Sequence, residues 1–485
     1  MGGGPGRDWG MDAALPRVCV VLLMLAGCSV GPVFAPPQAE VPEAYRAGGP
    51  AAPVWPEAEW WRGFGSVELD ALIAEARANS PDILAAVARV RQAEASLRLA
   101  GASLWPTVGV SADAQWARSS IPRRVGSQSV PSGRYAESRS YGIGPSISWE
   151  VDLWGRLAAG REAAEAAALA TSLDARSVAL SVVSAVAGTW FQALALQDRL
   201  DVAERNLADS ERVLAAVVAR AQVGTANQLD VAQQAALVAS LRARVPGLRS
   251  QLEQQLNALA VLTGRPPSAI TVRPGTLSAL RLPEVAPGLP SELLARRPDI
   301  AAAEADLRGA NANIRAARAA FLPNVTLSGR AGFENIALAT LFGPGSFFVS
   351  AVGSASQAIF DGGARRAVLA RNQAREEELL AEYRRVVIQA FTDVEDGVQA
   401  WRYSSEQEAL TRQAVATSQR AADIARAQLL AGTIDIVATL NAQTTLFSNL
   451  DALAQVRLAR FQSLLALYKA LGGGWSTADM AVPPA

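Results

Sequence analysis

Histidine is absent from this chain of 485 residues, and cysteine occurs only twice, at Cys19 and Cys28. Without histidine, the chain can form neither a Ser-His-Asp nor a Cys-His catalytic arrangement, and no metal site with imidazole ligands. Because both cysteines lie near the N-terminus, the remainder of the chain cannot form a disulfide or a thiolate cluster. These absences exclude catalysis by histidine or a cysteine pair, and we expect a protein that is not an enzyme and that holds no cofactor and no metal.

Net charge is also missing, because 45 basic and 45 acidic residues balance to zero. Proteins that bind nucleic acids depend on an excess of positive charge, so the balance argues against a nucleic-acid partner. Half of the residues, 50%, are hydrophobic. Such a share is normal for a globular protein, and it also suffices for a chain that faces lipid. The length permits one large domain or several ordinary ones.

The first 27 residues have the features of a signal peptide. Arg17 precedes a short apolar segment, residues 18–25, which is too short to span a bilayer as a helix. The segment ends in Leu25-Ala26-Gly27-Cys28, which resembles the lipobox of bacterial lipoproteins. We therefore predict a signal peptide at 1–27 and acylation of Cys28, followed by a proline-rich, lipidated leader at 28–56. The alternative is an ordinary signal peptide followed by an unmodified cysteine.

The rest of the chain is a tandem duplication. Four short anchors occur twice in the same order, with offsets of 217 residues (298 − 81 and 323 − 106) and 208 residues (432 − 224 and 472 − 264). The pairs are Pro81-Asp82-Ile83 with Pro298-Asp299-Ile300, Pro106 with Pro323, Gly224-Thr225 with Gly432-Thr433, and Gly264 with Gly472. Repeated anchors mark an internal duplication. We predict a first repeat at 57–264, a linker at 265–297, a second repeat at 298–472 and a C-terminal tail at 473–485.

Each repeat contains a long proline-free stretch, at 155–223 in the first and at 362–430 in the second. At 1.5 Å of rise per residue, each stretch would form a helix on the order of 100 Å long. Periodic helices of this length favour a coiled coil, and a shorter helix is expected after each Pro-Asp-Ile anchor. The chain is therefore predicted to be mainly α-helical.

Four segments alternate between apolar and polar residues instead, at 107–116, 141–151, 324–333 and 347–359. Alternation over about ten residues is typical of a transmembrane β-strand, which faces lipid on one side and a lumen on the other. The polar faces carry charged Asp113, Glu150 and Arg330, and aromatic residues stand near the strand ends, as in a membrane girdle. These aromatic residues are Trp116, Tyr141, Trp149 and Phe333.

The alternative is a half-buried sheet on a soluble core, and Pro145 is unfavourable within a closed barrel because it cannot donate a ladder hydrogen bond. Four strands cannot close a barrel by themselves. A membrane sheet of this kind therefore requires several chains around a common rotation axis.

Together these motifs resemble the TolC-like outer-membrane efflux proteins, in their NodT/OprM-type lipoprotein branch. The resemblance adds two motifs that follow the second and fourth alternating segments, Trp149-Glu150-Val151-Asp152-Leu153-Trp154-Gly155-Arg156 and Ile359-Phe360-Asp361-Gly362-Gly363. It implies a homotrimer in the outer membrane, with twelve strands in a shared barrel and a periplasmic tunnel of coiled-coil helices. It also implies export of drugs or other small molecules together with a periplasmic adaptor and an inner-membrane pump, of the resistance-nodulation-division type.

The resemblance further places a ring of aspartates at the periplasmic aperture, just after the second Gly-Thr turn. The matching positions here are Ala438 and Asn441, which carry no charge. In the first repeat, Asp230 and Gln233 occupy the equivalent positions. Three copies of Asp230 around a narrow axis would repel one another and attract cations. The alternative is an acidic residue in the first turn of a helix, favoured by the helix dipole.

The two Gly-Thr turns are the predicted docking tips for the adaptor, and they comprise Val223, Gly224, Thr225, Ala431, Gly432 and Thr433. The alternative interpretation of these turns is the ordinary termination of a long helix by glycine.

Two other functions compete with a passive exit duct. A periplasmic coiled-coil scaffold without a pore would leave the four alternating segments unexplained. An exported hydrolase or lyase could use Glu395 and Asp396, although their helical setting favours solvated faces.

Overall fold

The computed structural model describes residues 34–38, 40–46, 54–125, 127–286 and 288–475. The predicted signal peptide, Cys28 and most of the predicted tail lie outside the described residues. The chain forms two compact units, one made chiefly of residues 92–169 and 305–380, the other of 37–91, 170–304 and the segment from 381 onward. Each unit combines segments from both predicted repeats, so the duplicated sequence does not fold as two separate domains.

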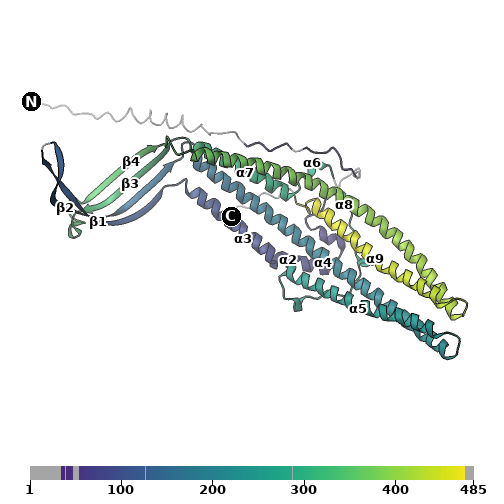
Figure 1. The fold of residues 1–485 in the computed structure, drawn as a ribbon. Coiled ribbons are helices and arrows are strands. Elements are labelled where there is room, and N and C mark those ends of the chain that lie inside the picture. Colours follow the sequence, from purple (N-terminus) through teal and green to yellow (C-terminus); the bar gives the residue numbers. More distant parts are fainter. Residues whose placement is uncertain (1–33, 39, 47–53, 126, 287, 476–485) are drawn as a thin grey trace, which may run out of the picture. The chain divides into compact units, whose positions relative to one another are not determined.

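The first unit contains a four-stranded antiparallel sheet in the order β1-β2-β3-β4 (Figure 1). Its strands are β1 (Thr107–Val125), β2 (Gln128–Val151), β3 (Asn324–Asn335) and β4 (Phe347–Ser356). All four alternating segments of the sequence are therefore strands. Within this sheet β1 and β4 each have only one neighbour, so both outer edges carry unpaired backbone groups.

Strands β1 and β2 are longer than we expected. We predicted a turn region between residues 116 and 141, but the two strands continue as a paired hairpin up to Val125 and Gln128. Strand β2 pairs with β3 only from Tyr141 onward, so residues 117–140 form a two-stranded extension, here called the outer ribbon. Both faces of the ribbon are polar, and hydrophobic alternation therefore could not reveal it.

Pro145 is accommodated by a local interruption of the sheet. It pairs with Val110 of β1, whereas the β2–β3 pairing skips from Ile143 to Ser146. At this point the backbones of Gly144 and Gly332 approach so closely that a Cβ on Gly144 would lie 2.0 Å from the carbonyl oxygen of Ala331. Glycine is required here because any side chain would separate the strands.

Long helices follow the strands in both repeats. Helices α4 (Arg156–Gln222) and α8 (Ala364–Leu430) each contain 67 residues, and helices α3 (Pro81–Ala102) and α7 (Pro298–Ala319) each contain 22. Within the first unit, tryptophans tie strand ends to helix ends. The indole N–H of Trp149 donates to Leu104 at 3.0 Å, and that of Trp154 donates to Pro323 at 2.7 Å.

The second unit holds the main hydrophobic core. It includes α2 (Val67–Asn79), α5 (Gln228–Thr263) and α9 (Ile436–Ala470), and the short elements η1 (Trp60–Phe64), η2 (Pro267–Ala269), η3 (Leu277–Ala279) and α6 (Pro290–Leu293). Aromatic rings occupy its centre. Phe191 lies 4.9 Å from Phe64 and 5.0 Å from Phe461 between ring centroids, and Trp60 stacks on Tyr468.

Helix α4 is the one described helix that is long and apolar enough to cross a membrane, by length and composition. Half of its most apolar stretch, 50%, is buried within the protein. Val186, Ala187 and Phe191 of this helix are fully buried in the core. The core therefore accounts for part of the apolar composition of α4.

Replacing Leu69, which is 0% exposed in α2, should test this core. We expect Leu69→Ala to lower the free energy of unfolding by about 2–5 kcal/mol, because it removes buried methyl groups and leaves a cavity. The measurement is the guanidinium unfolding midpoint of the purified protein in detergent. The matched control is Val67→Ala, two residues away and 85% exposed, which should change little. Equal midpoints for the two variants would contradict this core.

Candidate functional site

The loops that join α4 to α5 and α8 to α9 lie side by side, and they have the same backbone geometry (Figure 1). Gly224 and Gly432 both adopt left-handed conformations, with φ angles of 78° and 75°. In each loop the following threonine donates its backbone N–H to the last helical turn, Thr225 to Arg220 and Thr433 to Gln428. This is glycine termination of a helix by a Schellman motif, so the simpler interpretation of these turns holds locally.

The helices that begin after these loops are capped differently. In α5, Asn227 and Asp230 form a capping box, in which each side chain accepts the other residue's backbone N–H at 2.8 and 3.1 Å. In α9, Asp435 is the N-cap and accepts the N–H of Ala438 at 2.8 Å. The acidic residue has thus moved by three positions between the repeats. Asp230 acts as a first-turn acid, which is compatible with a further role at an aperture.

The predicted aperture residues stand at the start of two different helices. Asp230 and Gln233 lie in the first two turns of α5, and Ala438 and Asn441 lie in those of α9. Among the described residues no hydrogen bond or ion pair joins one pair to the other, although Val231 of α5 and Leu440 of α9 pack against the same hydrophobic cluster. The role of the four positions at an aperture stays a prediction.

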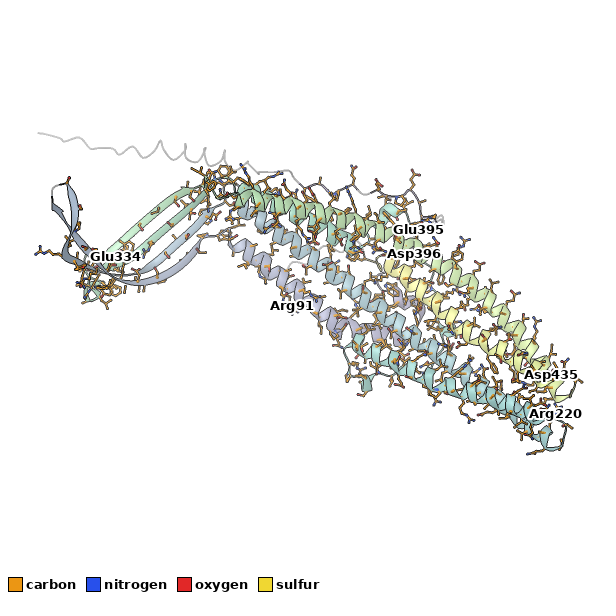
Figure 2. The ribbon with its side chains drawn as sticks, viewed as in Figure 1. Arg91, Arg220, Glu334, Glu395, Asp396 and Asp435 are labelled. Atoms are coloured by element: carbon orange, nitrogen blue, oxygen red, sulfur yellow. The ribbon has the colours of Figure 1, made fainter. Side chains whose placement is uncertain are left out.

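Arg220 connects the two loops, and the sequence analysis missed it. Its guanidinium donates to the carbonyl of Leu429, in the last turn of α8, at 2.6 Å, and to the carbonyl of Thr225 at 3.3 Å. Figure 2 shows Arg220 and Asp435 at this end of the helices. The last carbonyls of a helix lack partners within the helix, and Arg220 supplies one for α8. A basic residue in the last turn of α4 was the available signal.

Apolar side chains are exposed around the loops, namely Val223 (74%), Leu229 (63%), Leu430 (63%) and Val437 (46%). Between α4 and α8 there is a groove of about 160 Å³, lined by Val213, Val217, Leu429 and the charged Asp209, Arg212 and Arg426. Apolar surface rimmed by charged residues is typical of a protein–protein contact site.

In the sheet, the charged residues predicted on the polar faces occupy one side. Asp113 of β1 and Arg330 of β3 reach across β2 and pair at 3.4 Å. Gly142 of β2 leaves room for this, because a Cβ there would lie 3.1 Å from the Asp113 carboxylate. Glu150 pairs with Arg156 at the start of α4, at 2.5 Å. The polar face of the strands therefore carries paired charges.

One carboxylate is buried in the helical unit. Glu408 of α8 is 2% exposed and pairs with Arg412, Arg457 and Arg460. Burial by itself would raise the pKa of Glu408, but the hydrogen bonds from these three arginines outweigh it and hold the pKa below its ordinary value of 4.5. Arg460 also lies over the ring of Trp401, at 4.8 Å. The cluster ties α9 to α8.

A second cluster joins three segments through Arg297, which precedes α7. Burial lowers the pKa of Arg297, yet hydrogen bonds to Asp299 and Asp393 raise it overall. The guanidinium bonds to these carboxylates at 2.6 and 2.9 Å and to the carbonyl of Ala470 at 3.3 Å. These contacts border a cavity of about 590 Å³, to which Asp396 also contributes.

Glu395 and Asp396, the candidates for a hydrolase, do not form a joint site. Glu395 accepts the backbone N–H of Arg46, whereas Asp396 lines the cavity beside Arg297. Figure 2 places the two residues at neighbouring positions of α8. Among the described residues there is also no group of three or more acidic or cysteine side chains placed to hold a metal ion.

Comparison with known proteins decides the family. Residues 72–265 and 289–473 match the sequence profile of the outer membrane efflux proteins. The chain belongs to this family. The two matched segments follow the tandem repeat, and together they cover most of the chain.

Individual relatives agree with this. The chain is 40% identical over 425 residues to the pyoverdine export outer membrane protein OpmQ of Pseudomonas aeruginosa, covering 86% of this chain and 88% of that one. It is 30% identical over 461 residues to the cation efflux system protein CusC of Escherichia coli, covering 94% and 98%. The solved structure of the outer-membrane channel OprN superposes with a TM-score of 0.85 at 28% identity, covering 92% and 100%.

The resemblance that the sequence motifs carried is thereby confirmed, as is the mainly helical fold with a membrane sheet. The protein is an outer-membrane efflux channel of a Gram-negative cell, with a periplasmic tunnel. Its family and relatives are transport proteins.

Replacing Glu408 tests the buried cluster. The pKa of Glu408 is lower in the folded protein than its ordinary value of 4.5. Glu408 therefore stabilises the fold fully above pH 4.5, and this contribution is lost as the pH falls through the folded-state pKa. We expect Glu408→Gln to lower the free energy of unfolding at pH 7 by about 3 kcal/mol, since three arginines lose their shared partner. The variant should also lose less stability than the original protein as the pH falls below 4.5. Unfolding midpoints over a pH series measure both effects.

The matched control is Glu382→Gln, also on α8. Glu382 is exposed and pairs with Arg385 one helical turn away. Exposed pairs of this kind contribute little, so its unfolding midpoints should follow those of the original protein at every pH. If the Glu408 variant behaves like this control, the cluster does not stabilise the fold.

Proposed function

We propose that three copies of this chain form the exit duct of a tripartite efflux system. The observation that carries this proposal is the open sheet, whose edges at β1 and β4 are unpaired. In lipid, unpaired backbone groups cost several kcal/mol each, so only closed barrels of strands span membranes. Pairing β4 of one copy with β1 of the next satisfies both edges. Three copies then give the twelve-stranded barrel that the resemblance implies.

The duct itself carries out no chemistry. A periplasmic adaptor docks on the two loops between the long helices, where Val223 and Leu430 expose apolar surface beside the α4–α8 groove. The adaptor joins the duct to an inner-membrane pump, of the resistance-nodulation-division type that this branch of the family suggests. Opening is an equilibrium that adaptor binding biases, because a partner that favours the open form shifts its population.

Lipid on Cys28 anchors the mature chain to the outer membrane. Several acyl chains, at about 0.8 kcal/mol for each buried CH₂ group, give durable attachment. The sheet then spans the same membrane, with Asp113 and Arg330 facing its water-filled lumen.

The cargo is a small molecule that the pump selects. The relatives named for pyoverdine and for cations share this fold while carrying different solutes. We therefore assign the choice of substrate to the pump rather than to the walls of the duct. A scaffold without a pore is the weaker candidate, because it gives the open membrane sheet no role.

At the periplasmic aperture, we propose that Asp230 of each copy faces the axis at the level of Gln233, Ala438 and Asn441. Three carboxylates there would favour the entry of cations over anions. The capping role of Asp230 is kept by asparagine, so Asp230→Asn should remove the charge without unfolding the helix start.

Single-channel recording in a planar bilayer tests both the duct and the aperture. The purified trimer should conduct, and Asp230→Asn should move the reversal potential in a salt gradient towards zero because cation selectivity falls. Asp435→Asn is the matched control, since it removes an acid from the other helix start without changing an aperture position. A trimer that never conducts would contradict the proposal that this protein is a duct. Equal selectivity shifts in both variants would contradict the proposed role of Asp230 at the aperture.

Cysteine crosslinking tests the docking tips. Once Cys28 is acylated, Val223→Cys would supply the one free thiol of the mature chain. We expect this thiol, treated in cells with a short bifunctional reagent, to capture the adaptor because the tip lies in the contact. Val67→Cys, at a residue that is also exposed but lies far along the chain from the tips, is the control and should capture none. Capture through Val67 alone would place the adaptor elsewhere.

A further inference from the structure

The outer ribbon, residues 117–140, carries a net positive charge, although the net charge of the whole chain is zero. It contains five arginines, Arg118, Arg123, Arg124, Arg134 and Arg139, and one acidic residue, Glu137. Its net charge is therefore +4 (5 − 1). The neighbouring connection between β3 and β4, residues 336–346, carries no charged residue, so the basic character belongs to the ribbon.

Two of these arginines continue the apolar face of the sheet. Residues directly opposite in an antiparallel pair lie on the same face. Along this face Val110 pairs with Pro145, Ala114 with Tyr141 and Trp116 with Arg139. The next pair on the same face is Arg118 with Glu137. Arg118 and Arg139 thus stand on the face that turns to lipid, at and just beyond Trp116.

Their depth follows from strand geometry. Arg118 lies two residues beyond Trp116, which is about 7 Å along a strand before tilt is taken into account. The head-group region on each side of a bilayer is about 5–7 Å thick. If Trp116 and Tyr141 mark the edge of the hydrocarbon, both arginines therefore lie at the level of the lipid head groups.

The side chains are suited to phosphate. Arg118 and Arg139 are exposed, and the guanidinium of Arg118 lies 4.4 Å from the ring centroid of Tyr135. Such a stacked guanidinium keeps its N–H donors free while its position is restrained. Glu137 lies opposite Arg118, and no ion pair between them is among the contacts of the described residues. Arginine binds phosphate oxygens with two parallel hydrogen bonds, which favours it at such sites.

We propose that Arg118, Arg139 and Tyr135 form a binding site for the phosphate groups of lipid in the outer leaflet, which in this membrane means phosphorylated lipid A. This inference rests on the proposed function, because the sheet must span the membrane for the face to meet lipid. The site restrains the barrel at a defined depth and binds an anionic head group between the aromatic girdle and the end of the ribbon. Basic clusters beside a membrane-spanning segment recognise anionic head groups in this way.

The test uses the full-length trimer in detergent, titrated with diphosphoryl lipid A and with its dephosphorylated form. Native mass spectrometry counts the lipid molecules bound. The original protein should prefer the phosphorylated form, and Arg118→Gln with Arg139→Gln should weaken that binding at least tenfold. The matched control changes the same amount of charge on the same ribbon, Arg123→Gln with Arg124→Gln, and should bind nearly as the original does.

Three results would overturn the site. They are unchanged binding by the Arg118/Arg139 variant, equal losses in both double variants, and displacement of lipid A by inorganic phosphate at matched phosphate concentration. The last of these would assign the arginines to free anions. Size-exclusion profiles and single-channel conductance of the same samples separate this test from the proposed function. A trimer that conducts but binds lipid A without Arg118 and Arg139 removes only the lipid site.

Discussion

The constraint on which this structure depends is that a β-sheet in lipid must leave no backbone group unpaired. The chain supplies four strands whose edges, β1 and β4, are open, and no turn of its own can close so short a sheet into a barrel. In the trimer that we propose, neighbouring copies satisfy these edges. The same rotational symmetry would then bring the long helices α4 and α8 of each copy around a common axis.

Ion pairs and caps stabilise the helical part in specific places. Glu408 joins α8 to α9 through Arg457 and Arg460, and Arg297 joins the start of α7 to α8 and to the end of α9. Among the described residues at the ends of α4 and α8, beside the α4–α5 and α8–α9 loops, there are fewer ion pairs. Arg220 makes hydrogen bonds to the carbonyl of Leu429 in the last turn of α8 and to that of Thr225 in the α4–α5 loop. A small buried cluster of Val213, Val217, Leu429 and Ile436 also packs at these ends.

Patterns along the chain predicted the parts of the fold that depend on local chemistry. The two Gly-Thr turns are predictable because only glycine readily adopts the left-handed backbone that ends each helix. The strands are predictable where lipid and lumen impose alternation, and they were missed in the outer ribbon, where polar residues occur on both faces. The position of Arg220 in the last turn of α4 was a signal for a capping role, but its partner was not predictable, because the acceptor is the backbone carbonyl of Leu429, 209 residues away.

The sequence by itself determined the duplication, the long helices, the membrane strands and the family, since each depends on periodicity or on short motifs. Only the tertiary structure decided which charges meet. It paired Asp113 with Arg330 across a glycine, buried Glu408 among arginines, and showed that Asp230 caps its own helix while Asp435 caps the other. The reason is physical: periodicity reports the environment of a face, whereas a pair of charges depends on distances between segments that are remote in the chain.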